Sequence, residues 1–298
     1  MMKNKNEEFN GIFSAIDMKQ TKYRVIYGIL YIFIAFCALI VCALPVLWVL
    51  LAGFKDPAEL YAVPATFFPK EIRLSKVYEA WTSLNFYKYY VSTFVMAVGC
   101  VIATLVVSGM AGYSMSKLRP KGNGLICKVM FLLMLVPGGM AIVPLYMTFL
   151  DFTPLHLNLM DSYWPIWLMS AASAFNIILF KNSFDGVSDS ICEAARIDGA
   201  SSITIFIRIM IPLSKPVFMV VGLFAFMGSF GNFFWPYLLI NDPAKTVIGV
   251  QLYKLKSTQL TVDYQMLSLL FAMIPTFVLF AIFQNKIIGG MNIGGVKG

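Results

Sequence analysis

Long apolar stretches alternate with short polar segments along most of the chain. Each apolar stretch has about 20 residues or more, enough to cross roughly 30 Å of hydrocarbon as a helix. Ten-residue segments with alternating apolar and polar positions, which are typical of an outer-membrane barrel, are absent from the sequence. The pattern therefore predicts an all-α, polytopic membrane protein with six transmembrane helices. The predicted spans are residues 25–52, 89–113, 125–150, 163–181, 212–240 and 266–285.

Composition and charge agree with this fold class and set its orientation. Of the 298 residues, 59% are hydrophobic and 13% are charged, against about 25% charged residues in soluble domains. With the N-terminus in the cytoplasm, the inner segments hold about two Lys or Arg for each Asp or Glu, and the outer segments hold equal numbers, as the positive-inside rule requires. We therefore expect both termini in the cytoplasm. The net charge of +8 follows topology and does not indicate nucleic-acid binding.

The polar segments divide the chain into parts. The predicted parts are a cytoplasmic N-terminal segment (1–24), a six-span domain (25–287) with an external cap (53–88) and a cytoplasmic loop (182–211), and a cytoplasmic tail (288–298). Apolar residues at helical spacing in the first segment, namely Phe9, Ile12, Phe13 and Ile16, fit an interfacial helix or a disordered tail. In the cap, Ser75 is predicted to start a short helix that runs through Trp81.

The third predicted span contains residues that bend helices, namely Pro137, Gly138, Gly139 and Pro144. Proline removes a backbone donor, and the freed carbonyls need a partner inside the membrane. A bent helix that lines a pathway and a kink that serves packing both fit, and the frequency of Pro and Gly in transmembrane helices favours the packing kink.

The segment from Asp185 to Arg208 interrupts the apolar pattern with several charged residues. Each charge would cost about 3 kcal/mol at the bilayer centre, so the segment stays in the cytoplasm. A capping box of Ser190 and Glu193 is predicted to start a helix there. Asp198 and Gly199 are predicted to end it, because glycine adopts the left-handed C-cap conformation without steric cost.

A second helix is predicted directly after this one, capped by Ser201 or Ser202. Its expected apolar face consists of Ile203, Phe206, Ile207 and Met210. Pro212 is predicted to begin the fifth span. The product is a helix-turn-helix knob on the cytoplasmic side.

The knob sequence resembles a known motif. It begins with Glu193-Ala194-Ala195, has Gly199 after three further residues and Ile209 after nine more, and ends with Ile211-Pro212. This spacing is similar to the EAA motif of ABC importer permeases, with Ile211 where leucine is usual. The resemblance continues through VPLYMTFLDFTPLHLNL, GNFFWPYLLIND and the terminal GGVKG, and covers most of the chain. The sequence is thus similar to the carbohydrate-importing, MalG-type branch of these permeases. This implies the type I ABC importer permease fold and a prokaryotic cytoplasmic membrane.

The resemblance also implies a division of labour between chains. In that family the EAA loop forms a coupling helix that docks on a cytoplasmic ATPase, and closure of the ATPase switches the spans between inward-open and outward-open states. The residues of this sequence that match the EAA motif and its turn, and that are therefore implied to contact the ATPase, are Glu193, Ala194, Ala195, Arg196, Asp198 and Gly199. The tail residues expected to contact the ATPase are Gly294, Gly295, Val296, Lys297 and Gly298.

Several partners are expected with this role. They are a second homologous permease, two ATP-binding cassette subunits, an external solute-binding protein, a carbohydrate and membrane lipid. The sequence has no G-x-x-x-x-G-K-[ST] phosphate loop, so we expect no cofactor on this chain, and ATP with Mg²⁺ on the partner ATPase. One histidine and five scattered cysteines indicate neither a metal site nor a disulfide framework.

Sugars are bound through hydroxyl hydrogen bonds and aromatic faces. The candidate residues at membrane depth are Asn232, Trp235, Asn176 and Ser173. An interfacial anchor is the alternative for Trp235, and hydrogen bonding between helices is the alternative for Asn176 and Ser173.

Two other functions, a stand-alone transporter or channel and a membrane enzyme, fit the sequence less well than an importer permease. A stand-alone transporter or channel needs charges inside its spans, and these spans have almost none away from their ends. A membrane enzyme needs clustered catalytic groups, which this sequence lacks. A permease of the same class for a solute other than sugar stays open.

Overall fold

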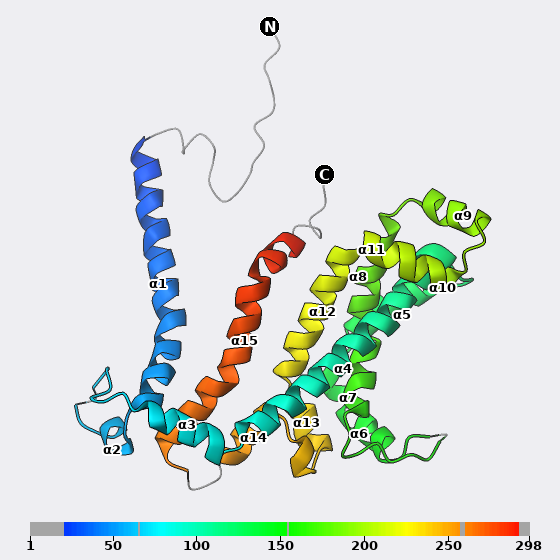
Figure 1. Ribbon diagram of the computed structural model, residues 1–298. Coiled ribbons are helices and arrows are strands. Elements are labelled where there is room, and N and C mark those ends of the chain that lie inside the picture. Colours follow the sequence, from blue (N-terminus) through cyan, green and yellow to red (C-terminus); the bar gives the residue numbers. More distant parts are fainter. Residues whose placement is uncertain (1–20, 65, 154, 257–259, 292–298) are drawn as a thin grey trace. The chain divides into compact units, whose positions relative to one another are not determined.

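The computed structural model describes residues 21–64, 66–153, 155–256 and 260–291 (Figure 1). In these ranges the regular structure is helical, apart from an isolated bridge between Phe152 and Leu157. The α-helices are α1 (Thr21–Phe54), α2 (Pro57–Leu60), α3 (Leu74–Ser83), α4 (Phe86–Tyr113), α5 (Asn123–Met134), α6 (Ile142–Leu150), α7 (Trp164–Ala171), α8 (Ala174–Asp185), α9 (Asp189–Ile197), α10 (Ser202–Ile205), α11 (Ile211–Leu213), α12 (Lys215–Phe230), α13 (Phe234–Leu239), α14 (Ile248–Lys256) and α15 (Val262–Met291). The π-helical segments are η2 (Ser114–Leu118) and η4 (Phe206–Met210), and the 3-10 segments are η3 (Gly138–Ala141) and η5 (Pro243–Lys245).

Among the described residues, three helices are apolar and long enough to cross a membrane, and up to six spans result if each of three bent helix pairs is counted as one span. The three single helices are Val25–Phe54, Phe86–Leu118 and Val262–Gln284. The other three are pairs of helices joined at a bend: 96° between α5 and the segment Gly138–Leu150, 44° between α7 and α8, and 87° between Ser202–Leu213 and α12. The all-α fold with six spans is therefore confirmed, and half of the spans are broken.

The break in the third span does not serve packing within this chain. A Cβ atom added at Gly138 or Gly139 would meet no atom within 4 Å. Pro137 has an extended backbone there, with ψ of 125°, and lacks the N–H that a continuous helix would need. The favoured packing kink is thus not supported by contacts of the described residues.

The prediction that Pro212 begins the fifth span is wrong. Pro212 lies in α11, inside the first half of the bent pair, and the second half, α12, begins at Lys215 after a bend at Ser214. Pro216 follows in the first turn of α12, where it cannot donate a hydrogen bond back to the preceding helix. The predicted stretch 212–240 is also not continuous, because α12 ends at Phe230 and α13 begins at Phe234.

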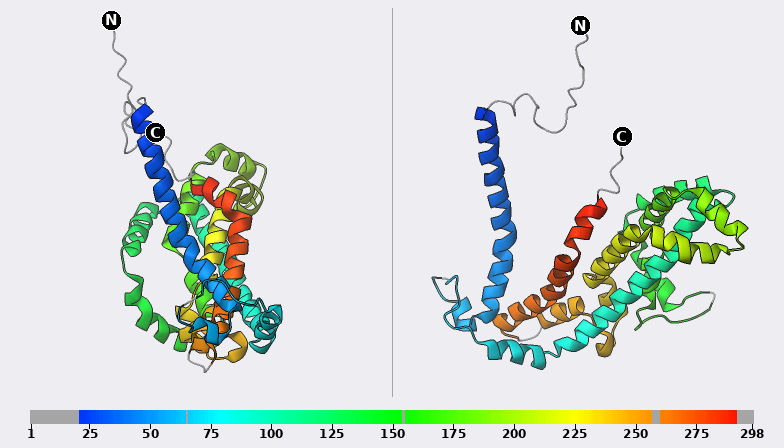
Figure 2. Two further views of the ribbon diagram at one scale, coloured as in Figure 1. Left: turned by 90° about the vertical axis from the view of Figure 1, so that its left-hand side faces the viewer. Right: turned by 45° about the horizontal axis from the view of Figure 1, so that its top comes forward.

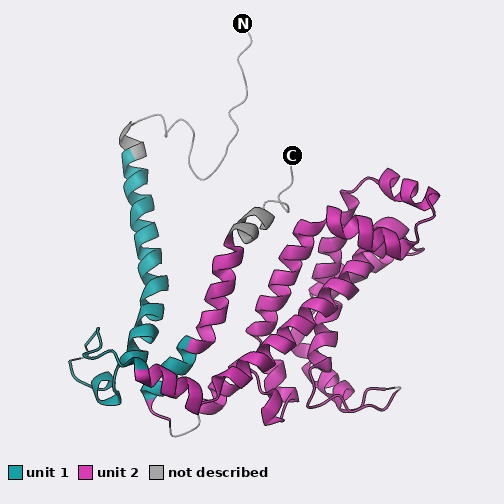
Figure 3. Cartoon of the chain, in the orientation of Figure 1, with its two compact units in different colours: residues 1–74, 262–270 teal, residues 75–261, 271–298 magenta. Residues whose placement is uncertain are grey.

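Figure 3 shows the chain divided into two compact units. The first comprises residues 1–74 and 262–270, and the second comprises residues 75–261 and 271–298. In the first unit, the Glu59 carboxylate accepts hydrogen bonds from the Thr66 hydroxyl at 3.0 Å and the Lys70 amide at 3.1 Å. The buried Lys55 ammonium donates to the Thr66 carbonyl and lies over the Trp48 ring. The first part of the predicted cap is therefore an ordered polar structure.

The rest of the cap belongs to the second unit. Helix α3 begins at Leu74, one residue before the predicted Ser75. Its Trp81 packs on Phe86 and Phe271 with ring centroids 6.1 and 5.3 Å apart. The possible interfacial helix at residues 9–16 lies outside the described residues.

Helix α4 is the centre of the second unit, and α7, α8 and α12 pack against it (Figure 2). Close approach of α8 requires glycine at position 112. A Cβ there would lie 2.6 Å from the Phe180 Cβ and 3.0 Å from the Ile177 carbonyl oxygen. Backbone therefore meets backbone at this crossing, as is common where small residues line helix contacts in membranes.

We predict that Gly112→Val separates α4 from α8. Overpacking of a dense core costs roughly 3 kcal/mol at such a site, so the midpoint of thermal unfolding in detergent should fall by several degrees. Gly138→Val is the matched control, because a side chain at Gly138 meets open space. Equal midpoints for the two variants would contradict the close packing of α4 on α8.

Candidate functional site

The helix-turn-helix knob forms as predicted at its turn. Helix α9 ends at Ile197, and Gly199 follows with φ of +82°. The Gly199 N–H donates to the Arg196 carbonyl at 3.0 Å, and the Ala200 N–H donates to the Ala195 carbonyl at 2.9 Å. These two bonds make a Schellman motif, which needs a residue that tolerates positive φ. The predicted glycine stop is confirmed.

The predicted start of α9 is wrong. Ser188, and not Ser190, occupies the N-cap, and its side chain caps no backbone amide. The Ser190 hydroxyl lies 2.7 Å from the Ser188 hydroxyl, so Ser190 and Glu193 form no capping box. Instead Asp189 lies in the first turn of α9, where a carboxylate interacts favourably with the helix dipole.

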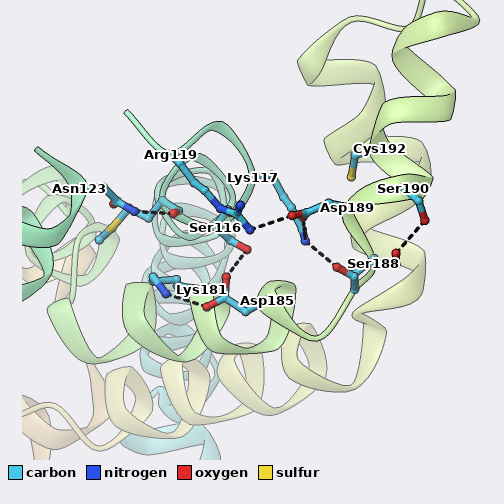
Figure 4. A network of polar contacts seen from close by, with 12 residues as sticks. Ser116, Lys117, Arg119, Asn123, Lys181, Asp185, Ser188, Asp189, Ser190 and Cys192 are labelled. Atoms are coloured by element: carbon cyan, nitrogen blue, oxygen red, sulfur yellow. Dashed lines mark hydrogen bonds and ion pairs between the residues drawn. The ribbon is translucent and has the colours of Figure 1, made fainter. Parts of the chain in front are cut away.

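Asp189 also joins α9 to the end of α4 (Figure 4). Its carboxylate accepts from the Lys117 ammonium at 2.6 Å and from the Arg119 guanidinium at 2.9 Å. The Lys117 side chain is 2% exposed, and its ammonium also donates to the Val187 carbonyl at 2.6 Å. The Lys117 ammonium holds the pKa of the Asp189 carboxyl below its usual value. The Asp189 carboxyl is therefore ionised at neutral pH.

A second contact of the same kind joins α8 to η2. The Asp185 carboxylate accepts from the Ser116 hydroxyl and from the Lys181 ammonium, each at 2.6 Å (Figure 4). We call these two contacts, Lys117–Asp189 and Ser116–Asp185, the clamp. The clamp connects the base of the knob to α4 and α8.

The second helix of the knob follows the prediction at its start and in part of its apolar face. The Ser201 hydroxyl accepts from the Thr204 amide at 3.2 Å, so Ser201 is the cap. The predicted apolar face is correct for Phe206 and Met210, which are buried, and wrong for Ile203 and Ile207, which are exposed. The residues that are buried are Ile205, Phe206 and Met210. The π-helical segment η4 has i→i+5 hydrogen bonds and more residues per turn, which shifts the buried positions.

The predicted coupling residues remain largely accessible on this knob. Glu193, Ala194, Arg196, Asp198 and Gly199 are exposed. Ala195 is half-buried against the cluster below, where Cys192 packs on Met210. Ile197, at the end of α9, is 87% exposed. The knob thus presents a charged and apolar surface that the described part of this chain leaves exposed.

A polar cavity lies away from the knob, where two broken spans meet. It has a volume of about 290 Å³ and is lined by α4, α7, α8, α12 and α13. The four predicted pathway residues, Ser173, Asn176, Asn232 and Trp235, all line it. Ser173 lies at the break between α7 and α8, and Asn232 lies at the break between α12 and α13. Tertiary structure therefore brings together residues far apart in the sequence.

Helix α4 supplies hydrogen bonds to the broken span beside this cavity. The Thr104 hydroxyl donates to the Ser170 carbonyl at 2.9 Å, and the Ser108 hydroxyl donates to the Ala171 carbonyl at 2.6 Å. These carbonyls are at the end of α7 and have no partner within that helix. Sequence reasoning missed this role, although the four-residue spacing of Thr104 and Ser108 places both on one helix face.

Sequence reasoning also missed the clamp. Lys117 and Asp189 are 72 positions apart, and neither has a pattern that names its partner. The sequence signal for it was the high density of charge in the two loops that contain these residues. The tail residues 294–298 lie outside the described residues. Within the described ranges no group of His, Cys, Asp or Glu has metal-binding geometry, and the five cysteines are free.

The chain is similar to known proteins over most of its length. The family described as binding-protein-dependent transport system inner membrane component matches residues 105–293. Protein LplC of Bacillus subtilis is 31% identical over 271 residues, which cover 86% of this chain and 89% of that protein. The arabinooligosaccharides transport system permease protein AraQ of Bacillus subtilis is 28% identical over 291 residues, covering 96% and 98%.

A solved structure has a similar fold. It is the crystal structure of a bacterial ABC transporter involved in the import of the acidic polysaccharide alginate. The TM-score is 0.73 at 23% sequence identity, and the match covers 93% of this chain and 99% of that chain.

We predict that Asp189→Asn destabilises the knob, because it leaves the buried Lys117 ammonium without an anion. The midpoint of thermal unfolding should fall by several degrees. The double variant with Lys117→Met should recover part of this loss, since the buried charge is then removed as well. Arg119→Met is the control and should change the midpoint little, because exposed ion pairs contribute little. A double variant less stable than Asp189→Asn would contradict the clamp.

Proposed function

Because this chain belongs to the family of binding-protein-dependent transport system inner membrane components, we propose that it forms one half of the membrane pathway of an ATP-driven importer for a sugar or oligosaccharide. It alternates between inward-open and outward-open states, driven by a separate ATPase.

The helix-turn-helix knob is the observation that carries this proposal. Its Schellman turn at Gly199 holds α9 as a short rigid helix with an exposed surface. In the clamp, Asp189 ties this helix to η2, the continuation of α4, and Asp185 ties the end of α8 to the same segment. A force applied to α9 by another protein would therefore reach the spans that line the cavity. The proposed contact residues are Glu193, Ala194, Ala195, Arg196, Asp198 and Gly199.

Other subunits are needed for such an importer. We assign ATP and Mg²⁺ to a separate pair of ATP-binding cassette subunits, since this sequence has no phosphate loop. A second homologous permease completes the pathway, and an external solute-binding protein delivers the solute. The tail residues 294–298 are proposed to contact the ATPase as well. This arrangement requires the knob and both termini to lie in the cytoplasm.

Figure 1 supports the two-sided arrangement within the second unit. Helix α9 lies at one end of it, and α13 and the loop after α6 lie at the other. The external loops at that far end are tied together by Asp161, whose carboxylate accepts from the Asn241 amide at 2.5 Å. The Tyr163 hydroxyl donates to the Lys245 carbonyl at 2.9 Å in the same region. The proposed ATPase-docking site and the proposed solute entry thus lie at opposite ends of the second unit.

A sugar fits the polar cavity. Hydroxyl and amide groups of Ser173, Asn176 and Asn232 line it together with the Trp235 indole. The relative AraQ is named for arabinooligosaccharide transport. Polar, hydrogen-bonding groups next to an aromatic ring are the usual means of holding a saccharide.

We predict that Gly199→Val uncouples ATP hydrolysis from uptake. A β-branched residue is strained at φ of +82°, so the turn between α9 and α10 should distort. Sugar uptake by the complete complex in proteoliposomes should fall at least about fivefold for a strain of roughly 1–3 kcal/mol. Gly199→Asn is the control and should keep most uptake, because asparagine tolerates this conformation. Normal uptake by the valine variant would count against the knob as the coupling element.

We predict that Asn232→Ala weakens solute binding in the pathway. Loss of one hydrogen bond of about 1 kcal/mol should raise the concentration for half-maximal transport several-fold. Asn176→Ala should act in the same direction. Asn241→Ala, in an exposed external loop, is the control. Unchanged concentration dependence for both cavity variants would place the solute site on the partner permease.

A further inference from the structure

Several polar groups in the cavity have no hydrogen-bond partner among the described residues of this chain. Within the described residues, the Ser173 hydroxyl caps no amide although Ser173 is at the N-cap of α8. The side chains of Asn176 and Ser229 likewise make no hydrogen bond to the described residues, and both line the cavity. By contrast, the Ser170 hydroxyl donates to the Trp167 carbonyl at 2.9 Å. The cavity wall therefore offers a solute hydroxyl and amide groups that the described residues do not use.

The cavity is also uncharged. Among the described residues that line it, none is Lys, Arg, His, Asp or Glu. A carboxylate moved from water into such a site loses its hydration and finds no cation, which costs several kcal/mol. Neutral hydroxyls lose much less, because serine and asparagine side chains replace the water.

Helix dipoles do not change this conclusion. The N-terminus of α8 at Ser173 would by itself favour an anion. The C-terminus of α7 lies at the same break, and its partial negative charge offsets that of α8. The second break likewise brings together the end of α12 and the start of α13. The two breaks therefore leave no strong net field of either sign.

One aromatic side chain is held in place at the edge of this polar surface. Trp235 contacts Phe149 in an edge-to-face arrangement with centroids 6.4 Å apart, and contacts Phe234 at 5.4 Å. A fixed indole offers an apolar face to the C–H groups of a sugar ring while the polar groups take its hydroxyls.

We propose that this half of the pathway selects an uncharged saccharide and excludes acidic ones, and that Ser229 joins Ser173 and Asn176 in binding its hydroxyls. The proposal rests on the proposed importer function and deepens it by naming the substrate class. It separates this chain from the transporter of similar fold, whose substrate is an acidic polysaccharide.

The test compares a neutral oligosaccharide with its uronate counterpart of the same backbone and length, which differ only in their carboxylates. The complete permease–ATPase complex in lipid nanodiscs, without the solute-binding protein, is heated with each sugar at millimolar concentration. The neutral sugar should raise the midpoint of thermal unfolding and the uronate should not. Omitting the binding protein ensures that the selectivity measured is that of the membrane complex.

A variant tests the residues themselves. Asn176→Lys places a cation in the cavity and should raise the uptake ratio of uronate to neutral sugar about tenfold, equal to about 1.4 kcal/mol. Asn241→Lys adds the same charge in an exposed external loop and should leave the ratio unchanged. The comparison in the unmodified complex stays decisive where the lysine variant fails to fold.

The outcomes separate the two levels of the proposal. If neither type of saccharide is imported by the complex with its binding protein, the sugar-importer function itself fails. Two results overturn the selectivity while the importer function stands. One is equal stabilisation by the uronate and the neutral sugar, and the other is import of the neutral sugar without any stabilisation in nanodiscs.

Discussion

Each bend in a membrane-spanning helix frees backbone carbonyls that lipid cannot hydrogen-bond. This chain bends three of its six spans, so the freed groups need partners within the protein. Helix α4 supplies them for the fourth span, through the hydroxyls of Thr104 and Ser108. Glycine at position 112 brings α8 close enough to α4 for the same helix to hold both halves of the broken span.

The polar cavity is a consequence of this arrangement. Where α7 stops and α8 starts, the chain turns by 44° and exposes Ser173 and Asn176 between helices. The second break, near Asn232, adds Trp235 and Ser229. A straight apolar helix could not present so many polar side chains at this depth without a large cost. The breaks therefore create a polar surface and α4 keeps it stable.

The clamp joins the helices around this cavity to the knob. The buried Lys117 at the end of α4 holds Asp189 at the start of α9, and Ser116 holds Asp185 at the end of α8. Because α4 also contacts the broken span through Thr104 and Ser108, one helix is in contact with both the knob and the cavity wall. Movement of the knob relative to α4 would leave the buried Lys117 ammonium without its half-exposed partner Asp189, so the two are expected to move together.

The sequence by itself determined the features that depend on neighbouring residues. The length of the apolar stretches indicated six spans, and Gly199 and Ser201 marked the ends of the two knob helices through local backbone geometry and capping. The start of α9 was not predictable in this way. Ser190 with Glu193 had the right spacing for a capping box, but the partners of Asp189 come from another helix, and they place the start at Asp189.

Only the tertiary structure decided which polar groups are used within the chain and which remain for a solute. Ser170 and Ser173 are three positions apart and look alike in sequence, yet only the Ser170 hydroxyl has a partner within the described residues. The same holds for the π-helical segment after Ile205, which buries Met210 and exposes Ile207. Hydrogen-bond partners and burial depend on residues that are distant in the chain, and local sequence patterns contain no information on which distant residues will meet.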